Sequence, residues 1–208
     1  SDVDLAANLA MQVARKPVRR VEPILGRGVV NWVVKAEAGD VTVVVRLSRA
    51  ADDRAALEGY RKEAWCLDRA HDIGLPGPRT LSTGMHEGRA YMVMTYVPGQ
   101  SGDGVPMDVL GVWKELGGYA ARIARIPVTG FGNRLVDPRS GRFEDSFHPS
   151  WRARVEYNID RLEPDDPFMS LGIYAPSQQE QIRTHFREML AQEWELALHH
   201  GDLVPENT

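Results

Sequence analysis

The chain has 208 residues, of which 43% are hydrophobic and 26% are charged, a composition typical of a globular protein with a substantial core. Its 25 basic and 29 acidic side chains give a net charge of -4, which argues against a nucleic-acid-binding protein. There is no long apolar run, no secretory signal and only one cysteine, Cys66, so no internal disulfide can form. We therefore expect a cytoplasmic protein with no membrane span.

The chain begins with an amphipathic helix pattern in residues 1–20, followed by two strand-like runs at 21–25 and 32–36. A glycine segment separates these runs and contains Gly26, Gly28 and, where a third glycine would stand, Asn31. Glycines let backbone amides approach phosphate oxygens closely, so the segment is suited to covering a nucleotide. A hairpin turn without a ligand explains the same residues equally well.

A third strand is predicted at residues 41–47, a β-branched run that contains one charge, Arg46. The next helix is predicted to begin near Asp52 and Asp53, both good N-cap residues, and to stop at Gly74. Glu63 on this helix is a candidate partner for Arg46. In kinases, too, a basic residue on the third strand is followed along the chain by a glutamate on the next helix. Alternatively, Arg46 is an exposed edge-strand charge and Glu63 belongs to a solvated helix face or pairs with neighbouring cations.

Residues 79–85 and 89–96 read as two further strands around a turn, which makes five strands with one helix inserted after the third. The change in composition at Pro98-Gly99 predicts a hinge between two lobes. Just before the hinge, Met94 has two interpretations, a residue at the back of a nucleotide pocket or an ordinary core residue.

The second half of the chain is predicted to be mainly helical. Helical spacing extends over residues 106–125, Ser150 can cap a helix, and Ser177 with Glu180 reads as a capping box that opens a helix through Trp194. Residues between Ile126 and Pro149 read as a loop and a polar stretch. The acidic turn at 163–166 reads as a solvated surface, although it could meet a cationic substrate.

The sequence ends in its most specific motif, H-G-D-L-V-P-E-N followed by Thr208. Asp202 and Asn207 lie on a turn that Gly201 and Pro205 favour. A carboxylate there can face a substrate hydroxyl while the amide oxygen reaches a metal ion that holds nucleotide phosphates. The pattern H-G-D-x-x-P-x-N resembles the catalytic loop of the aminoglycoside phosphotransferase family, small-molecule kinases built on the protein-kinase fold.

The resemblance implies an α+β fold of the protein-kinase-like, two-lobe type. Residues 1–97 would form the N-terminal nucleotide-binding lobe, with a five-stranded antiparallel sheet and an inserted helix. Residues 98–208 would form part of a mainly helical C-terminal lobe. Such enzymes also need a metal-binding aspartate on a strand after the catalytic loop, and the sequence has no residues there. We therefore expect a truncated form of a longer enzyme, with little or no catalysis by these 208 residues alone.

Carried over to this sequence, the resemblance makes Asp202 the catalytic base, His200 a brace for its loop and Asn207 a ligand of Mg²⁺. Arg46, where the family pattern has a lysine, would bind the phosphates of ATP or GTP, and Glu63 would hold Arg46 in place. The product would be a small molecule phosphorylated on a hydroxyl group.

The remaining nucleotide contacts would come from the glycine segment and the hinge. The backbone carbonyl of Thr95 and the amide of Val97 would bind the adenine edge, with Met94 behind it. The acceptor stays open: an aminoglycoside, with antibiotic resistance as a consequence, or a fructosamine, choline, homoserine or a macrolide. A nonenzymatic nucleotide-binding protein is the alternative from another class. The sequence does not indicate an oligomeric state.

Overall fold

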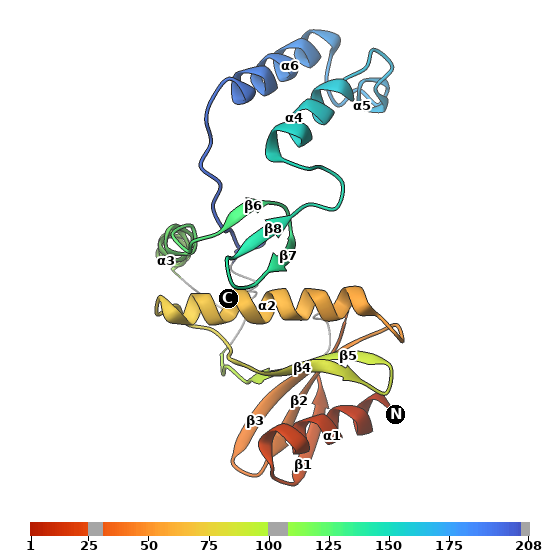
Figure 1. Ribbon diagram of the computed structural model, residues 1–208, viewed down its shortest axis with the longest axis vertical. Coiled ribbons are helices and arrows are strands. Elements are labelled where there is room, and N and C mark those ends of the chain that lie inside the picture. The colour runs from red at the N-terminus through yellow and green to blue at the C-terminus, as the bar shows by residue number, and fades with distance from the viewer. Residues whose placement is uncertain (25–30, 100–107, 205–208) are drawn as a thin grey trace. The chain divides into compact units, whose positions relative to one another are not determined.

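The computed structural model describes residues 1–24, 31–99 and 108–204 (Figure 1). These residues divide into two units, each considered as far as it is described. The first comprises residues 1–126 and 199–208, and the second comprises residues 127–198. The lobes predicted at 1–97 and 98–208 are a different division of the chain and stay a prediction.

A five-stranded sheet forms the centre of the first unit. Its strands are β1 (Val18–Pro23), β2 (Asn31–Ala38), β3 (Val41–Ser48), β4 (Thr80–His86) and β5 (Arg89–Thr95). They lie in the order β1-β2-β3-β5-β4, and every neighbouring pair is antiparallel. The helix α2 (Arg54–Asp72) follows β3, so the predicted five strands with one inserted helix are confirmed.

The sheet lies between two helices of this unit (Figure 1). Successive side chains of a strand point to opposite faces, and β3 follows this rule. Val43, Val45 and Leu47 are fully buried in a cluster shared with α1 (Asp2–Ala14), whereas Arg46 faces α2. Each buried aliphatic side chain of this kind stabilises the fold by about 1.5–3 kcal/mol.

Side-chain caps begin both helices. The Ser1 hydroxyl accepts the Asp4 amide hydrogen at 3.3 Å, and the Asp53 carboxylate accepts the Ala56 amide hydrogen at 2.9 Å. These bonds satisfy amides that the first helical turn leaves without partners. The chain leaves α2 through Gly74, whose φ of 71° favours glycine. The predicted start near Asp52 and Asp53 and the stop at Gly74 are therefore confirmed, with Asp53 as the cap.

Helix α3 (Val109–Ile123) lies near the end of residues 1–126 of the first unit, and a small sheet begins the second unit. The strands of this sheet, in the order β6-β8-β7, are β6 (Thr129–Phe131), β7 (Arg134–Asp137) and β8 (Arg142–Glu144). The helices of the second unit are α4 (Trp151–Asp160), α5 (Pro167–Ser170) and α6 (Pro176–Leu190). Within the described ranges, no helix has the length and apolar character needed to cross a membrane.

The small sheet occupies a stretch that the sequence predicted to be a loop, so that prediction is wrong. Its strands have only three or four residues, too few for a clear alternation of polar and apolar side chains. Strands β6 and β8 approach closely at Gly130, because a Cβ atom there would lie 2.1 Å from the backbone oxygen of Phe143. Only glycine allows β6 and β8 to approach in this way.

The structure also corrects the start and end of α6. The helix begins at Pro176, and the side chain of Gln178 accepts the Ala175 amide hydrogen at 2.8 Å, so the predicted Ser177–Glu180 capping box is wrong. Glu180 instead pairs with Arg183 at 2.7 Å and with Arg187 at 3.1 Å. The helix ends at Leu190 rather than continuing through Trp194.

Candidate functional site

Arg46 lies on β3, the central strand of the five-stranded sheet. It stands opposite Val33 of β2 and Met92 of β5, so a strand pairs with it on each side. The alternative interpretation, an exposed charge on an edge strand, is therefore wrong. A cation at such a position needs a partner, since removing an unpaired charge from water is costly.

Glu63 of α2 is that partner. Its Oε1 atom forms an ion pair with Nη1 of Arg46, and the exposed fractions of the two side chains are 37% for Glu63 and 22% for Arg46. Partial burial reduces the screening that makes fully exposed ion pairs weak. Among the described residues, Glu63 pairs with Arg46 and not with its neighbours Arg61 or Lys62. A guanidinium has five N–H donors in a planar fork, so the group that contacts Glu63 is also able to bind a phosphate.

Tyr60 is a third member of this cluster, and the sequence analysis missed its part in it. Its side chain is only 3% exposed, and its ring centroid lies 5.3 Å from Cζ of Arg46, within the range of a cation–π contact. Tyr60 and Glu63 lie one turn apart on the same face of α2, so both reach the same arginine. Burial raises the pKa of Tyr60 to about 12, so its hydroxyl stays protonated at neutral pH.

Asn31, the last residue of the predicted glycine segment, is the first residue of β2. Its Oδ1 atom accepts a hydrogen bond from the Tyr60 hydroxyl at 3.0 Å. The structure thus connects Asn31 to the Arg46–Glu63 pair through one tyrosine. Gly26 and Gly28, the other residues predicted to cover the phosphates, lie outside the described residues.

The hinge residues begin at the end of β5. Met94 is 7% exposed and belongs to a buried cluster with Tyr60, Ala90 and Met92, so it is a core residue and also lies on the Arg46 face of the sheet. Val97 is more than half exposed, at 52%. The predicted nucleotide contacts of both residues stay predictions.

Thr95 is bonded to Arg79 in an unusual way. Its amide donates to the Arg79 carbonyl at 2.9 Å, which marks the two residues as a hydrogen-bonded antiparallel pair. In a regular pair the Arg79 amide would return a bond to the Thr95 carbonyl. Here that amide donates to the Thr95 side-chain hydroxyl instead, at 2.8 Å. The hydroxyl therefore takes a donor that would otherwise occupy the backbone carbonyl predicted to bind a nucleotide base.

The predicted catalytic loop is described as far as Val204. Its residues 199–204 belong to the same unit as the five-stranded sheet, and Gly201 has a φ of 84°, which fits the predicted turn. Asp202 and His200 are both exposed. Within the described part of the chain, His200 forms no hydrogen bond, so its bracing function stays a prediction.

The predicted Mg²⁺ ligand, Asn207, lies outside the described residues. Among the residues that are described, no group of three or more His, Cys, Asp or Glu side chains could hold a metal ion. The oxygen donor predicted for the ion in this loop, the Asn207 amide, is of the hard type that Mg²⁺ prefers. Its chemistry fits the ion, and the binding of Mg²⁺ stays a prediction.

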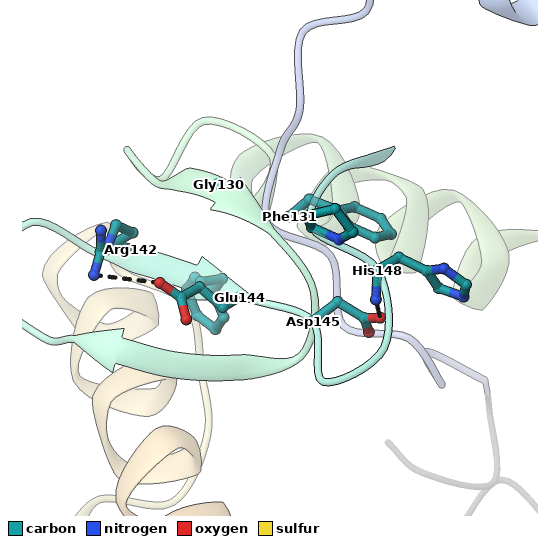
Figure 2. Close-up of a pocket in the computed structure, with 8 residues that line it drawn as sticks. Gly130, Phe131, Arg142, Glu144, Asp145 and His148 are labelled. Carbon is teal, nitrogen blue, oxygen red and sulfur yellow. Dashed lines mark hydrogen bonds and ion pairs between the residues drawn. The ribbon is translucent and has the colours of Figure 1, made fainter. Parts of the chain in front are cut away.

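A separate pocket of about 400 Å³ lies within the second unit (Figure 2). Glu144 in this pocket pairs with Arg134 and Arg142, each at 3.3 Å, and Asp145 accepts the His148 amide hydrogen at 2.9 Å. This backbone bond is the main cause of a pKa of Asp145 below its ordinary value. The Asp145 carboxylate thus holds the start of the segment between β8 and α4, whereas Glu144 pairs within the small sheet. The pocket is lined by Gly130, Phe131, Arg142, Phe143, Glu144, Asp145, His148 and Pro149.

Several solved aminoglycoside phosphotransferases share the fold of this chain. Aminoglycoside phosphotransferase APH(4)-Ia is similar with a TM-score of 0.57 and 18% identity, over 77% of this chain and 50% of that chain. Spectinomycin phosphotransferase APH(9)-Ia, in complex with ADP and spectinomycin, has a TM-score of 0.56 and 14% identity, over 98% and 64%. The type VIII aminoglycoside-3'-phosphotransferase has a TM-score of 0.51 and 23% identity, over 99% and 70%.

At these identities the likeness shows the fold, and the predicted protein-kinase-like α+β fold is confirmed. The chain spans 50% and 64% of the length of the first two structures. No curated protein gives a significant match to the sequence. The sequence profile of the phosphotransferase enzyme family matches residues 21–208, so the chain belongs to the phosphotransferase enzyme family.

Proposed function

We propose that the chain binds ATP or GTP and forms the nucleotide-binding part of a kinase that phosphorylates a hydroxyl group of a small molecule. The observation that carries the proposal is the Arg46–Glu63 ion pair, which joins the central strand to the inserted helix in a chain of a phosphotransferase family. A cytoplasmic location, where nucleotide and Mg²⁺ are available, is part of the proposal.

In this proposal Arg46 binds phosphate oxygens of the nucleotide, and Glu63 and Tyr60 hold its guanidinium in position. The Thr95 carbonyl and the Val97 amide bind the base. An arginine with a fixed partner is well suited to this task, since positioning and neutralisation of charge supply most of the catalysis of phosphoryl transfer.

The proposed reaction is a transfer to an alcohol. The acceptor oxygen attacks the γ-phosphorus, the bond from phosphorus to the bridging β–γ oxygen breaks, and the acceptor proton passes to the Asp202 carboxylate. The products are the phosphorylated acceptor and ADP or GDP. When bound, Mg²⁺ would neutralise phosphate charge with Asn207 among its ligands.

For the acceptor we propose an aminoglycoside-type compound. Support comes from the similar structures, one of which is a complex with spectinomycin. A kinase of another small metabolite would use the same nucleotide site, so the acceptor is tested separately, by a screen of aminoglycosides, fructosamines, choline, homoserine and macrolides. If the proposal is correct, an aminoglycoside is phosphorylated in this screen. A bacterial strain that expresses the enzyme should then become resistant to that aminoglycoside.

Nucleotide binding is tested by calorimetric titration of the chain with Mg²⁺ and AMP-PNP, and in parallel with the guanosine analogue. Arg46→Met removes the proposed phosphate ligand and should weaken binding by about 10- to 100-fold, the value of one or two charge-assisted hydrogen bonds. Arg69→Met is the matched control, because Arg69 lies on α2, the helix that carries Glu63, but pairs with Asp72 at 3.1 Å and not with Glu63. Its affinity should match the wild type.

The outcomes separate the alternatives. Equal binding by wild type and Arg46→Met would remove Arg46 from the site, and an absence of binding in the wild type would refute the nucleotide proposal as a whole. Binding by an intact enzyme that phosphorylates no hydroxyl compound would favour the nonenzymatic alternative.

A further inference from the structure

Tyr60 is the residue of α2 that is buried most deeply, and it carries a polar group into the core. Its ring packs in the cluster with Ala90, Met92 and Met94, where a phenylalanine would fill the same space. A buried hydroxyl is costly unless it forms a hydrogen bond. The Tyr60 hydroxyl therefore needs a hydrogen-bond partner.

That partner is not part of the core cluster. The hydroxyl donates to Oδ1 of Asn31, which is 29 positions away in sequence and only partly buried. Because Asn31 is both the last residue of the predicted glycine segment and the first residue of β2, the bond holds the start of that strand against α2. The bond restricts the rotation of the Asn31 side chain.

The ring of the same residue contacts Arg46. Cζ of Arg46 lies 5.3 Å from the ring centroid, and Glu63, one turn further along α2, contacts the same guanidinium. A guanidinium between a carboxylate and an aromatic face has fewer orientations open to it than one held by the carboxylate alone. Tyr60 therefore restrains two groups at once, by its hydroxyl and by its ring.

We infer that Tyr60 is a positioning residue of the nucleotide site, which sets the relative placement of Asn31 and Arg46 before a nucleotide phosphate binds. The inference rests on the proposed nucleotide binding. A ligand then binds to groups that are already ordered, so less conformational entropy is lost on binding. The residue acts through its two neighbours and needs no contact with the nucleotide itself.

The test compares two tyrosine hydroxyls of the first unit, Tyr60 on α2 and Tyr91 on β5. Tyr60→Phe removes the bond to Asn31 and keeps the ring, whereas Tyr91→Phe removes a hydroxyl that lies 3.2 Å from Oγ of Ser82, away from Arg46. Titration with Mg²⁺ and AMP-PNP should show affinity reduced about two- to tenfold for Tyr60→Phe, the value of one hydrogen bond, and unchanged for Tyr91→Phe. Thermal midpoints without nucleotide check that both variants are folded.

A double-mutant cycle identifies the path of the effect. If the Tyr60 hydroxyl acts through Asn31, then Asn31→Ala with Tyr60→Phe should bind no more weakly than the weaker single variant, whereas independent effects would add. Asn31→Ala also tests the bond from its more accessible end if Tyr60→Phe does not fold.

Additive losses, an equal loss in the Tyr91→Phe control, or wild-type affinity in Tyr60→Phe would each overturn the inference. A wild-type chain that binds no nucleotide would overturn the proposed function, and the inference with it. A wild-type chain that binds, with Tyr60→Phe unchanged, would overturn the inference alone.

Discussion

The side-chain hydroxyl of Thr95 accepts the backbone amide hydrogen of Arg79 at 2.8 Å, in the position where the Thr95 carbonyl would be the regular acceptor. We predict that Thr95→Val returns this amide to the carbonyl and weakens nucleotide binding, because the base would then compete for the carbonyl with Arg79. The expected loss is about two- to tenfold, the value of one hydrogen bond.

Thr95→Ser is the control for this prediction, since it keeps the hydroxyl and should keep the wild-type affinity. Calorimetric titration with Mg²⁺ and AMP-PNP measures both. Equal affinities for the valine and serine variants would show that the hydroxyl has no influence on the hinge.

Asp202 is predicted to act in the chemical step. In an active preparation of the enzyme, Asp202→Asn should lower kcat by about 10²- to 10⁴-fold, because asparagine cannot accept the acceptor proton. Nucleotide affinity should stay close to that of the wild type. A steady-state assay of ADP release measures the first quantity and titration measures the second; retained turnover would contradict the assignment.

Asp166 is predicted to stabilise the second unit. The sequence analysis placed it on a solvated acidic turn, which is wrong for this residue, since it is only 8% exposed. Its carboxylate accepts the Phe168 amide hydrogen at 2.8 Å and the Tyr174 hydroxyl hydrogen at 2.5 Å. Asp166→Ala should cost about 1–2 kcal/mol, the typical value of a lost helix cap. The same change at the adjacent, exposed Asp165 is the control, and urea unfolding is the measurement.

Cys66 should react slowly with alkylating reagents at neutral pH. It is partly buried on α2, and burial raises the pKa of its thiol, so less of the reactive thiolate is present than in a free cysteine. The native state then holds its proton to higher pH than the unfolded state, so stability should fall as pH rises above the ordinary pKa of cysteine. Because the chain has one cysteine, iodoacetamide labelling in the presence and absence of urea reports on this residue alone.

The five-stranded sheet and α2 could be predicted because their signals are local. The β-branched run before Ser48 favours a strand, and Asp53 is an N-cap residue that the structure uses as one. The Arg46–Glu63 pair was one of two interpretations, and it depended on the order in which kinases place a basic strand residue and a helix glutamate. The strands and the helix themselves needed only the period of the side chains and the ends of the elements.

The contacts of Tyr60 and Thr95 could not be predicted in the same way. The Tyr60 hydroxyl donates to Asn31, 29 positions away in sequence. The Arg79 amide donates to the side-chain hydroxyl of Thr95, 16 positions away, and not to the Thr95 carbonyl. Periodicity identifies Tyr60 as a core residue but does not show where its hydroxyl points. The small sheet was missed for a related reason, since its strands are defined by the close approach of Gly130 to Phe143 more than by any residue pattern.

The position of Arg46 on the central strand also has a consequence for hydrogen exchange. Amides of a strand that is paired on both sides exchange with solvent mainly when a large part of the fold opens, whereas amides near an exposed chain segment exchange through small local openings. Arg46 should therefore be among the most slowly exchanging residues of the first unit, and the exposed Val97 among the faster ones. The cation of the site would then belong to the most persistent part of the fold, and the base-binding backbone to a part that opens far more often.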